Sequence, residues 1–172
     1  MHAYYYNEHT GEDKCGAHQF TPPRPVTAEQ LGRIGVLYWR LNESDRMAKL
    51  EAICKERDYK NRDEVRAAVV EAVANLLVHR HLHEDEEIRF ILDGSGYFDV
   101  RDNNDEWIRI FMERGDLIVL PAGIYHRFAL DEHQYVHTMR LFKDEPKWAA
   151  VYRPADDNPC RVAYVQSLSA AS

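Results

Sequence analysis

The sequence predicts a mostly β protein with N-terminal helices, folded as a single domain. Apolar residues recur at helical spacing before residue 80, whereas from His81 onward they alternate with a period of two. A chain of 172 residues, 45% apolar and 30% charged, suits one globular domain with a substantial core. We divide it into an N-terminal helical and wrapping segment (1–80), a central core (81–142) and a C-terminal wrapping segment (143–172).

Three helices are expected in the N-terminal segment. Thr27 begins the first, and Gln30 three residues later completes a capping box. Apolar residues at helical spacing extend this helix, namely Leu31, Ile34, Tyr38 and Leu41. The second helix is expected from Ser44 to Arg57. The third is expected from Asp63 to Leu77, a stretch rich in Ala, Val and Glu.

Strands follow in the central core. The chain from His81 is expected to be extended, until Gly94 and Gly96 turn it. Three further strands have β-rich composition and turn residues at their ends: Tyr97–Arg101, Trp107–Met112 and Tyr135–Phe142. The first two are joined by a hairpin loop at 102–105, and Asp116–Leu120 is predicted to be a buried strand. From Arg153 the chain is expected to be irregular.

Four side chains from two segments are candidate ligands of one divalent metal ion. His81, His83 and Glu87 share the parity of an extended chain, so they point to one face. In the second segment, a turn at 121–123 delivers His126 at the start of the next strand. Imidazole and carboxylate together suit iron, nickel, zinc or manganese rather than calcium or magnesium. The combined pattern HxHxxxE and GxxxxxPxGxxH favours this metal site over an ordinary surface placement of the four residues.

Three other polar residues are not expected to bind the metal ion. His79 continues the two-residue period, but the spacing to Glu87 favours the pair at 81 and 83, so we place His79 behind the ligands or facing solvent. Glu86 has the opposite parity and is expected to be a solvated carboxylate. His137 is expected to be structural.

Arg89 and Phe128 are expected to face the metal ligands. Arg89 follows Glu87 by two residues, and a buried cation beside a metal is costly unless an anion compensates it. That anion is either a bound substrate or an Asp or Glu of the barrel. Phe128 follows His126 by two residues and is expected in the pocket wall, with plain core packing as the alternative.

Composition and charge narrow the function classes. The net charge of −7 argues against nucleic acid as a partner, and no apolar run is long enough to span a membrane. The N-terminus is too polar for a signal peptide. Three scattered cysteines indicate reduced thiols, namely Cys15, Cys54 and Cys160. We expect a cytoplasmic monomer, with a nuclear location as well in a eukaryotic source.

The two metal-binding segments resemble the paired motifs of the cupin superfamily, whose fold is a double-stranded β-helix barrel similar to a jelly roll. More specifically, the chain resembles the acireductone dioxygenases of methionine salvage. This resemblance is densest over Glu86–Asp102 and Leu120–Phe128, and it continues at Met139–Phe142 and Tyr152–Asp156.

The resemblance implies a substrate, a metal and a pocket. The implied substrate is 1,2-dihydroxy-3-oxo-5-(methylthio)pentene, cleaved with O2 at one metal ion per chain. Iron(II) in the family gives formate and 4-methylthio-2-oxobutanoate, whereas nickel(II) gives carbon monoxide, formate and 3-methylthiopropanoate. Family arginines at the positions of Arg89 and Arg140 belong to the substrate pocket, and Leu77 stands where relatives often place a pocket-lining Phe.

Two other functions fit the metal motif alone. One is a cupin isomerase or epimerase that acts on a sugar without O2. The other is a non-enzymatic metal-binding cupin. Oxygen consumption with an acireductone distinguishes the first from a dioxygenase, and turnover by iron-loaded protein distinguishes the second.

Overall fold

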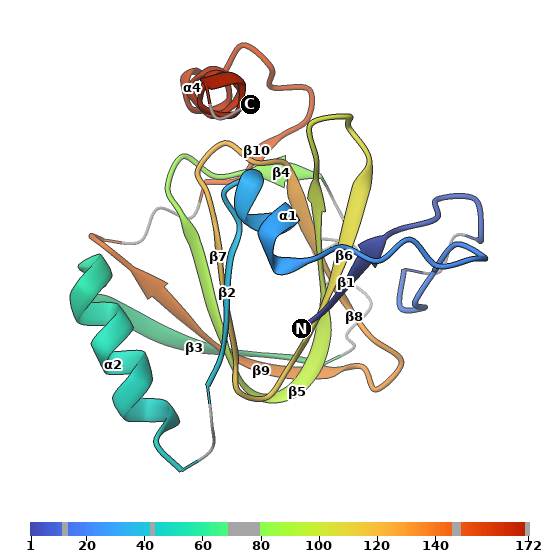
Figure 1. Ribbon diagram of the computed structural model, residues 1–172. Helices are drawn as coiled ribbons and strands as arrows, with labels where there is room; N and C mark the ends of the chain where they lie inside the picture. Colours follow the sequence, from blue (N-terminus) through green and yellow to red (C-terminus); the bar gives the residue numbers. More distant parts are fainter. Residues whose placement is uncertain (12–13, 42–43, 69–79, 146–148, 171–172) are drawn as a thin grey trace.

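Antiparallel strands dominate the computed structural model, which describes residues 1–11, 14–41, 44–68, 80–145 and 149–170 (Figure 1). The N-terminal elements are β1 (His2–Tyr5), α1 (Ala28–Arg33), β2 (Leu37–Arg40), α2 (Arg46–Arg57) and β3 (Asn61–Ala68). The central strands are β4 (His81–Leu82), β5 (Glu87–Arg101), β6 (Trp107–Glu113), β7 (Asp116–Leu120), β8 (His126–Leu130) and β9 (Tyr135–Phe142). The chain ends with β10 (Val151–Tyr152) and α4 (Pro159–Ala170). The mostly β class predicted from the sequence is confirmed.

Strand β5 belongs to both halves of the barrel. Its first half pairs with β7 and β9, which pair in turn with β2 and β3. Its second half pairs with β6 and β8, in the order β1-β6-β5-β8-β4-β10. The pairing register shifts between Ile91 and Asp93, and Gly94 adopts a φ of +71°. The strand therefore continues through Gly94 and Gly96 and bends from one half into the other, so the predicted turn between two separate strands is wrong.

Gly94 is required at this bend for steric reasons as well. A Cβ at this position would collide with the backbone carbonyl oxygen of Tyr135 on β9. Positive φ is also strained for residues with a side chain. A single glycine thus allows one long strand to serve two sheets.

Alternation along the strands builds two apolar layers. The core inside the barrel contains Ile91, Phe98, Val100, Ile108, Ile110, Ile118 and Leu120. A second layer lies between α2 and the outer face of the β2-β7-β5-β9-β3 half, and it contains Leu50, Cys54, Ile88, Phe90, Leu117, Val119, Met139 and Leu141. Residues of opposite parity on β5 therefore bury on opposite faces, which leaves one face for the functional side chains.

The outer face of the other half carries a buried charged cluster. The Asp99 carboxylate accepts from Arg109 at 2.7 and 2.8 Å and from Arg127 at 2.7 Å. Both guanidinium groups stack on the Tyr6 ring, at 4.3 and 5.0 Å from its centroid. Asp99 and Arg109 are completely buried, and Arg109 also donates to the carbonyl of Lys14 at 3.0 Å. The first residues of the chain, around Tyr6 and Lys14, are therefore held over this face by a hydrogen bond and by ring stacking.

Several predicted elements match closely. Tyr135–Phe142 and Asp116–Leu120 are strands over the expected ranges, and the hairpin of β5 and β6 closes with Arg101 opposite Trp107. The capping box of α1 is present, since the Thr27 N–H donates to Gln30 at 2.8 Å and the Gln30 N–H donates to Thr27 at 3.2 Å. The second helix spans Arg46–Arg57, so it begins two residues later than expected and ends where expected.

Three other expectations are wrong. The first helix ends at Arg33, because Gly35 takes a φ of +79° and the chain continues as β2, which contains Tyr38. The region predicted as a third helix from Asp63 begins as β3, paired along its length with β9, and residues 69–79 lie outside the described residues. The C-terminal stretch is irregular over 153–158 as expected, but it then forms α4 from Pro159 to Ala170.

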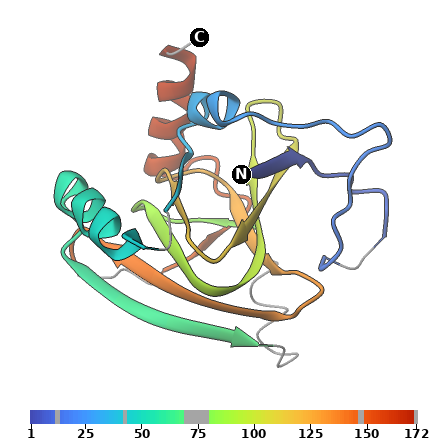
Figure 2. The ribbon, with the colours of Figure 1, turned by 60° about the horizontal axis from the view of Figure 1, so that its bottom comes forward.

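Helix α4 stands at the end of the barrel that also carries α1 (Figures 1 and 2). The Tyr164 hydroxyl donates to the carbonyl of Ile34, directly after α1, at 2.9 Å. Gly123 lies so close to α4 that a Cβ there would collide with the carbonyl of Cys160. The helix thus packs against the turn that precedes β8.

Within the described residues, no helix is both long and apolar enough to cross a bilayer.

Candidate metal centre

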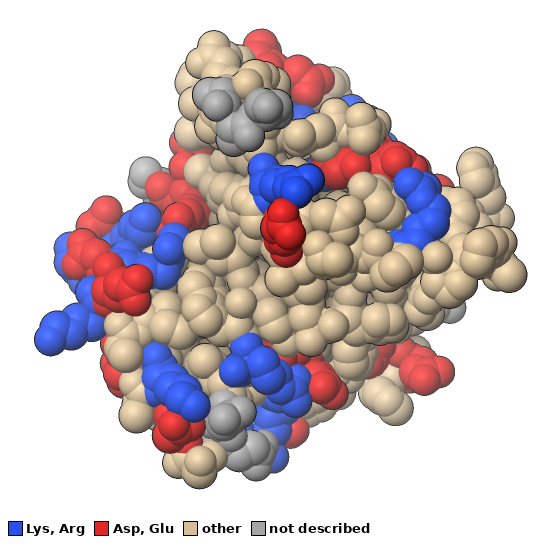
Figure 3. All heavy atoms as spheres, viewed as in Figure 1, with Lys and Arg blue, Asp and Glu red and all other residues tan. Residues whose placement is uncertain are grey.

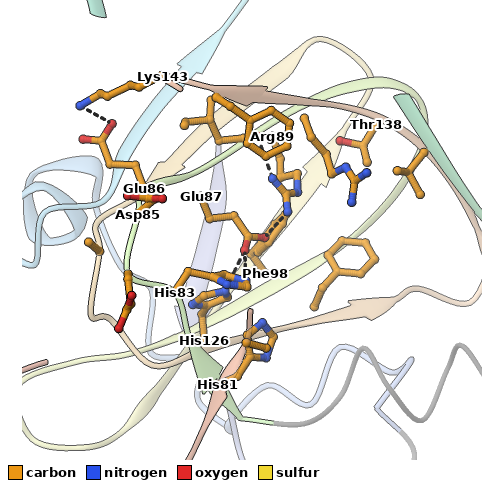
Figure 4. A pocket seen from close by; sticks show the side chains of 18 of the residues that line it. His81, His83, Asp85, Glu86, Glu87, Arg89, Phe98, His126, Thr138 and Lys143 are labelled. Atoms are coloured by element: carbon orange, nitrogen blue, oxygen red, sulfur yellow. Dashed lines mark hydrogen bonds and ion pairs between the residues drawn. The ribbon is translucent and has the colours of Figure 1, made fainter. Parts of the chain in front are cut away.

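The four side chains predicted as metal ligands meet at one point in the barrel. Their ligand atoms all lie within 4.8 Å of one another. His81 comes from β4, His83 follows it, and Glu87 and His126 are the first residues of β5 and β8. In Figure 4 the three rings and the carboxylate point toward a common centre. Strand pairing, with His81 opposite His126, brings the two sequence segments together.

Ring orientation prepares the histidines for a metal. Glu87 Oε2 lies 3.0 Å from Nε2 of His83 and 3.0 Å from Nε2 of His126. The Nδ1 atoms face backbone carbonyls, 3.2 Å from Ala149 for His83 and 3.0 Å from Ile124 for His126. Metal-binding histidines use one nitrogen for the ion and the other for such a partner. These residues therefore fit a divalent transition metal in both donor type and orientation.

The turn at 121–123 holds the metal-binding residues of the two segments together. The Gly123 N–H donates to the carbonyl of His83 at 2.9 Å, which ties the turn before β8 to the ligand segment. Gly123 has a φ of +81°, a conformation that favours glycine. The predicted role of the turn at 121–123, to deliver His126 to the start of a strand, is confirmed.

Electrostatics keep the carboxylate ionised. Burial alone would raise the pKa of Glu87, but the charge of Arg89 and the interactions with His126 and His83 hold that pKa well below its usual value. Burial acts to lower the pKa of His83, yet the hydrogen bond and charge of Glu87 outweigh it and raise the pKa. Glu87 is therefore an anion before any metal binds, as a carboxylate ligand must be.

Two arginines lie beyond Glu87 along the same face. Arg89 Nη2 is 3.2 Å from Glu87 Oε1, and Arg89 Nη1 donates to the carbonyl of Ile88 at 3.0 Å. Burial lowers the pKa of Arg89, with Glu87 opposing that effect. Arg140 is the register partner of Arg89 on β9, and it contacts Asp63 of β3 at 2.7 and 2.6 Å. Both arginines line the cavity, and each has a carboxylate of the barrel as a partner.

A cavity of about 600 Å³ opens beside the four ligands. Its apolar wall contains Val65, Ala67, Ile91, Phe98, Phe128 and Val136. Phe128 packs edge-on against Phe98 with centroids 5.0 Å apart, so it lies in the wall as expected. Leu77, the other predicted pocket residue, falls outside the described residues, as does His79. The cavity thus has a cationic and metal-binding end and an apolar side.

The cavity rim includes a residue that the sequence assigned to solvent. Glu86 accepts from Arg57 at 3.0 Å and from Tyr59 at 3.1 Å, and it pairs with Lys143 at 3.1 Å. The expectation of a solvated carboxylate is therefore wrong, because α2 supplies a distant partner that parity does not reveal. His137 points to the other face of β9 and lies 2.8 Å from Glu64, a structural contact as predicted.

Sequence reasoning missed the contribution of β3 to the site. Val65 and Ala67 line the cavity, and Asp63 binds Arg140. Residues 61–68 alternate between half-buried and exposed positions, which is the pattern of a strand. The alternation is visible only in the structure, because the half-buried positions include polar Asn61 and Asp63 as well as Val65 and Ala67. The helix-favouring composition therefore decided the prediction.

Charged side chains of both signs are mixed on one face of the protein. On the face shown in Figure 3, Lys and Arg lie among Asp and Glu rather than in one continuous basic area. The face therefore lacks the basic stripe typical of nucleic-acid binding.

Comparison with known proteins places the chain in a family. The model of the ARD/ARD' family matches residues 2–150. An acireductone dioxygenase of Yarrowia lipolytica is 49% identical over 99% of this chain and 100% of its own length. The human acireductone dioxygenase is 48% identical over 98% of each chain.

A solved structure shares the fold. The acireductone dioxygenase from Bacillus anthracis, determined with a cadmium ion in its active centre, superposes with a TM-score of 0.66. It is 22% identical and covers 76% of this chain and 94% of its own. The barrel is therefore of the cupin type. Together with the full-length relatives and the metal-binding residues, these findings show that the chain belongs to the ARD/ARD' family of acireductone dioxygenases.

Proposed function

We propose that the protein cleaves 1,2-dihydroxy-3-oxo-5-(methylthio)pentene with O2 as a metal-dependent acireductone dioxygenase of methionine salvage. The observation that carries this proposal is the convergence of three imidazoles and one ionised carboxylate at the end of a cavity of about 600 Å³. Family membership over nearly the whole chain supports the same activity.

The residues around the cavity have complementary tasks. His81, His83, Glu87 and His126 would hold the metal, which supplies positive charge that stabilises an enediolate through its vicinal oxygens. Arg89 stands next to this centre and adds a fixed cation for an anionic substrate. The attraction between this cation and an anionic substrate is stronger in the cavity than in water, because the cavity has a lower effective dielectric constant.

The apolar side of the cavity suits the rest of the substrate. Phe98, Phe128 and Val136 form a wall that can bury a methylthio-ethyl chain. With the polar groups at one end and apolar groups along the side, the substrate has one favoured orientation. Orientation of this kind brings the enediol to the metal end and removes water from it.

The products are proposed to depend on the metal. Iron(II) is expected to give formate and 4-methylthio-2-oxobutanoate, and nickel(II) to give carbon monoxide, formate and 3-methylthiopropanoate. The ligand set supports both ions, because imidazole and carboxylate accept either. Both outcomes follow the behaviour implied by the family resemblance.

The test is product analysis on two homogeneous preparations. Protein stripped with a chelator is reloaded anaerobically with iron(II) or with nickel(II), and each form receives the acireductone and O2. Oxygen uptake, carbon monoxide and the two acids are quantified beside metal content. Identical products from both forms would refute the metal-dependent part. Absence of oxygen uptake in both would refute the activity and favour a sugar isomerase or a non-enzymatic metal-binding protein.

The assembly and location are also proposals. Cys15, Cys54 and Cys160 are free thiols, which fits a reducing compartment such as the cytoplasm, with a nuclear fraction in a eukaryotic cell. A monomer remains our expectation. Light scattering of purified protein and fractionation of the source cells test these two statements.

A further inference from the structure

We propose that Asp63 is a positioning residue that aims Arg140 at the anionic substrate, an inference that rests on the function proposed above. Asp63 lies on β3, outside the motifs that define the metal centre. Its side chain belongs to a row of charges that runs across three neighbouring strands and ends beside the metal ligand Glu87.

Strand register creates this row. Asp63 on β3 lies opposite Arg140 on β9, and Arg140 lies opposite Arg89 on β5. Arg89 in turn contacts Glu87. Two cations are therefore adjacent in the centre of the row, with one carboxylate at each end. Neighbouring like charges repel, so each arginine depends on its own carboxylate to remain in place.

The contact between Asp63 and Arg140 fixes an orientation as well as a charge. Arg140 Nε donates to Asp63 Oδ1 at 2.7 Å, and Arg140 Nη2 donates to Asp63 Oδ2 at 2.6 Å. Two parallel charge-assisted bonds hold the plane of the guanidinium group. The side chain of Arg140 is 23% exposed and lines the cavity. Asp63 therefore determines which way this cation faces.

Removal of Asp63 would redirect Arg140. An Asn side chain at this position keeps one acceptor oxygen, while its amide N–H groups would face an Arg donor. One of the two bonds and the negative charge are lost. Glu87 then becomes the neighbouring carboxylate within the row for both arginines. We expect Arg140 to lose its defined position and to hold the substrate less well.

The same strand pair supplies a matched control. Glu64, next to Asp63 on β3, contacts His137 of β9 at 2.8 Å on the opposite face. Glu64→Gln alters a carboxylate–imidazole contact between the same two strands without altering the cavity. A merely structural role of Asp63 would give Asp63→Asn and Glu64→Gln similar consequences.

The experiment compares five proteins: wild type, Asp63→Asn, Glu64→Gln, Arg140→Met and the double variant that combines Asp63→Asn with Arg140→Met. The iron-loaded forms are assayed for kcat and KM with the acireductone. The nickel-loaded forms are titrated calorimetrically with oxalate, a dianion with two vicinal oxygens. Metal content and melting temperature are measured for every protein, with Arg140→Met as the reference for the double variant.

Asp63→Asn is expected to lower kcat/KM and oxalate affinity each by about tenfold, the loss typical of a weakened charged hydrogen bond. Glu64→Gln is expected to leave both unchanged at a similar melting temperature. In the Arg140→Met background, Asp63→Asn should have no further effect, because its action passes through Arg140. Equal effects of Asp63→Asn and Glu64→Gln, tighter oxalate binding, or an undiminished effect in the Arg140→Met background would overturn the inference. An inactive wild type that still binds oxalate would instead refute the proposed function.

Discussion

His81 lies directly opposite His126 where β4 pairs with β8, and their ring centroids are 4.6 Å apart. Strand β4 is only two residues long, and its other edge pairs with the equally short β10. Backbone pairing of such short strands contributes little stability by itself. A metal ion bound by both histidines would therefore cross-link these strands as well as serve the chemistry.

The first prediction concerns this ligand pair. His81→Ala is expected to lose most of the bound metal, and with it the rise in melting temperature that metal loading gives the wild type. His137→Ala is the control, because this histidine faces away from the cavity. Metal content by mass spectrometry and thermal melting with and without metal provide the measurement. Equal metal retention by the two variants would contradict the ligand assignment.

The second prediction separates charge from ligation at Arg89. Arg89→Met is expected to keep the metal but to lower kcat/KM by about one to two orders of magnitude, the equivalent of roughly 1.5–3 kcal/mol for a charged hydrogen bond. Arg89→Lys should restore only part of this, since an ammonium group cannot reproduce the geometry of a guanidinium. Steady-state kinetics beside metal analysis test both variants. Wild-type efficiency in Arg89→Met would make Arg89 only a structural partner of Glu87.

The third prediction concerns the buried cluster under the N-terminal segment. Asp99→Asn leaves Arg109 and Arg127 buried beside a neutral amide, and removal of one partner from a buried ion pair costs about 3–5 kcal/mol of unfolding free energy. Glu106→Gln breaks the exposed pair with Arg24 and is expected to cost much less, because solvent screens this pair. Urea unfolding of both variants gives the comparison. Similar costs would show that the cluster is well solvated.

The fourth prediction is a loss of stability at alkaline pH. Burial, opposed in part by Arg57, raises the pKa of Tyr59 from the usual tyrosine value of 10.0 to about 12. Because the raised pKa favours the protonated folded form, this stabilisation is fully present below pH 10 and is lost as the pH rises through 12. Burial also raises the pKa values of Tyr4, Tyr38 and Tyr164. Unfolding free energy should therefore fall above pH 10 in the wild type and fall less steeply in Tyr59→Phe. Identical slopes would refute the contribution of Tyr59.

The metal centre was predictable because its determinants are local. His81 and His83 are two residues apart, so they share one face of an extended chain. A turn containing glycine sets the position of His126. The same reasoning placed Arg89 next to Glu87. Only the pairing of β4 with β8, which is a long-range event, had to be supplied by the family resemblance or by the structure.

Strand β3 could not be predicted from its local sequence. Its composition of Asp, Glu, Arg and Ala favours a helix, and a carboxylate such as Asp63 is not expected on the inward face of a strand. That position is tolerated because Arg140, far along the chain, satisfies the carboxylate. Helix α4 is a different case, since a signal existed: Pro159 suits a first helical position, and the Asn158 side chain accepts from the Cys160 N–H at 2.9 Å.

The continuity of β5 through both halves of the barrel has a thermodynamic consequence. This one strand carries Glu87 at its first residue and Asp99 near its last, so the metal centre and the buried arginine cluster share a backbone. Loss of pairing in either sheet is therefore expected to disturb the central strand of the other. Unfolding is therefore expected to be a single cooperative transition. Metal binding would then stabilise the whole barrel, including the residues around Tyr6 that cover the buried arginine cluster.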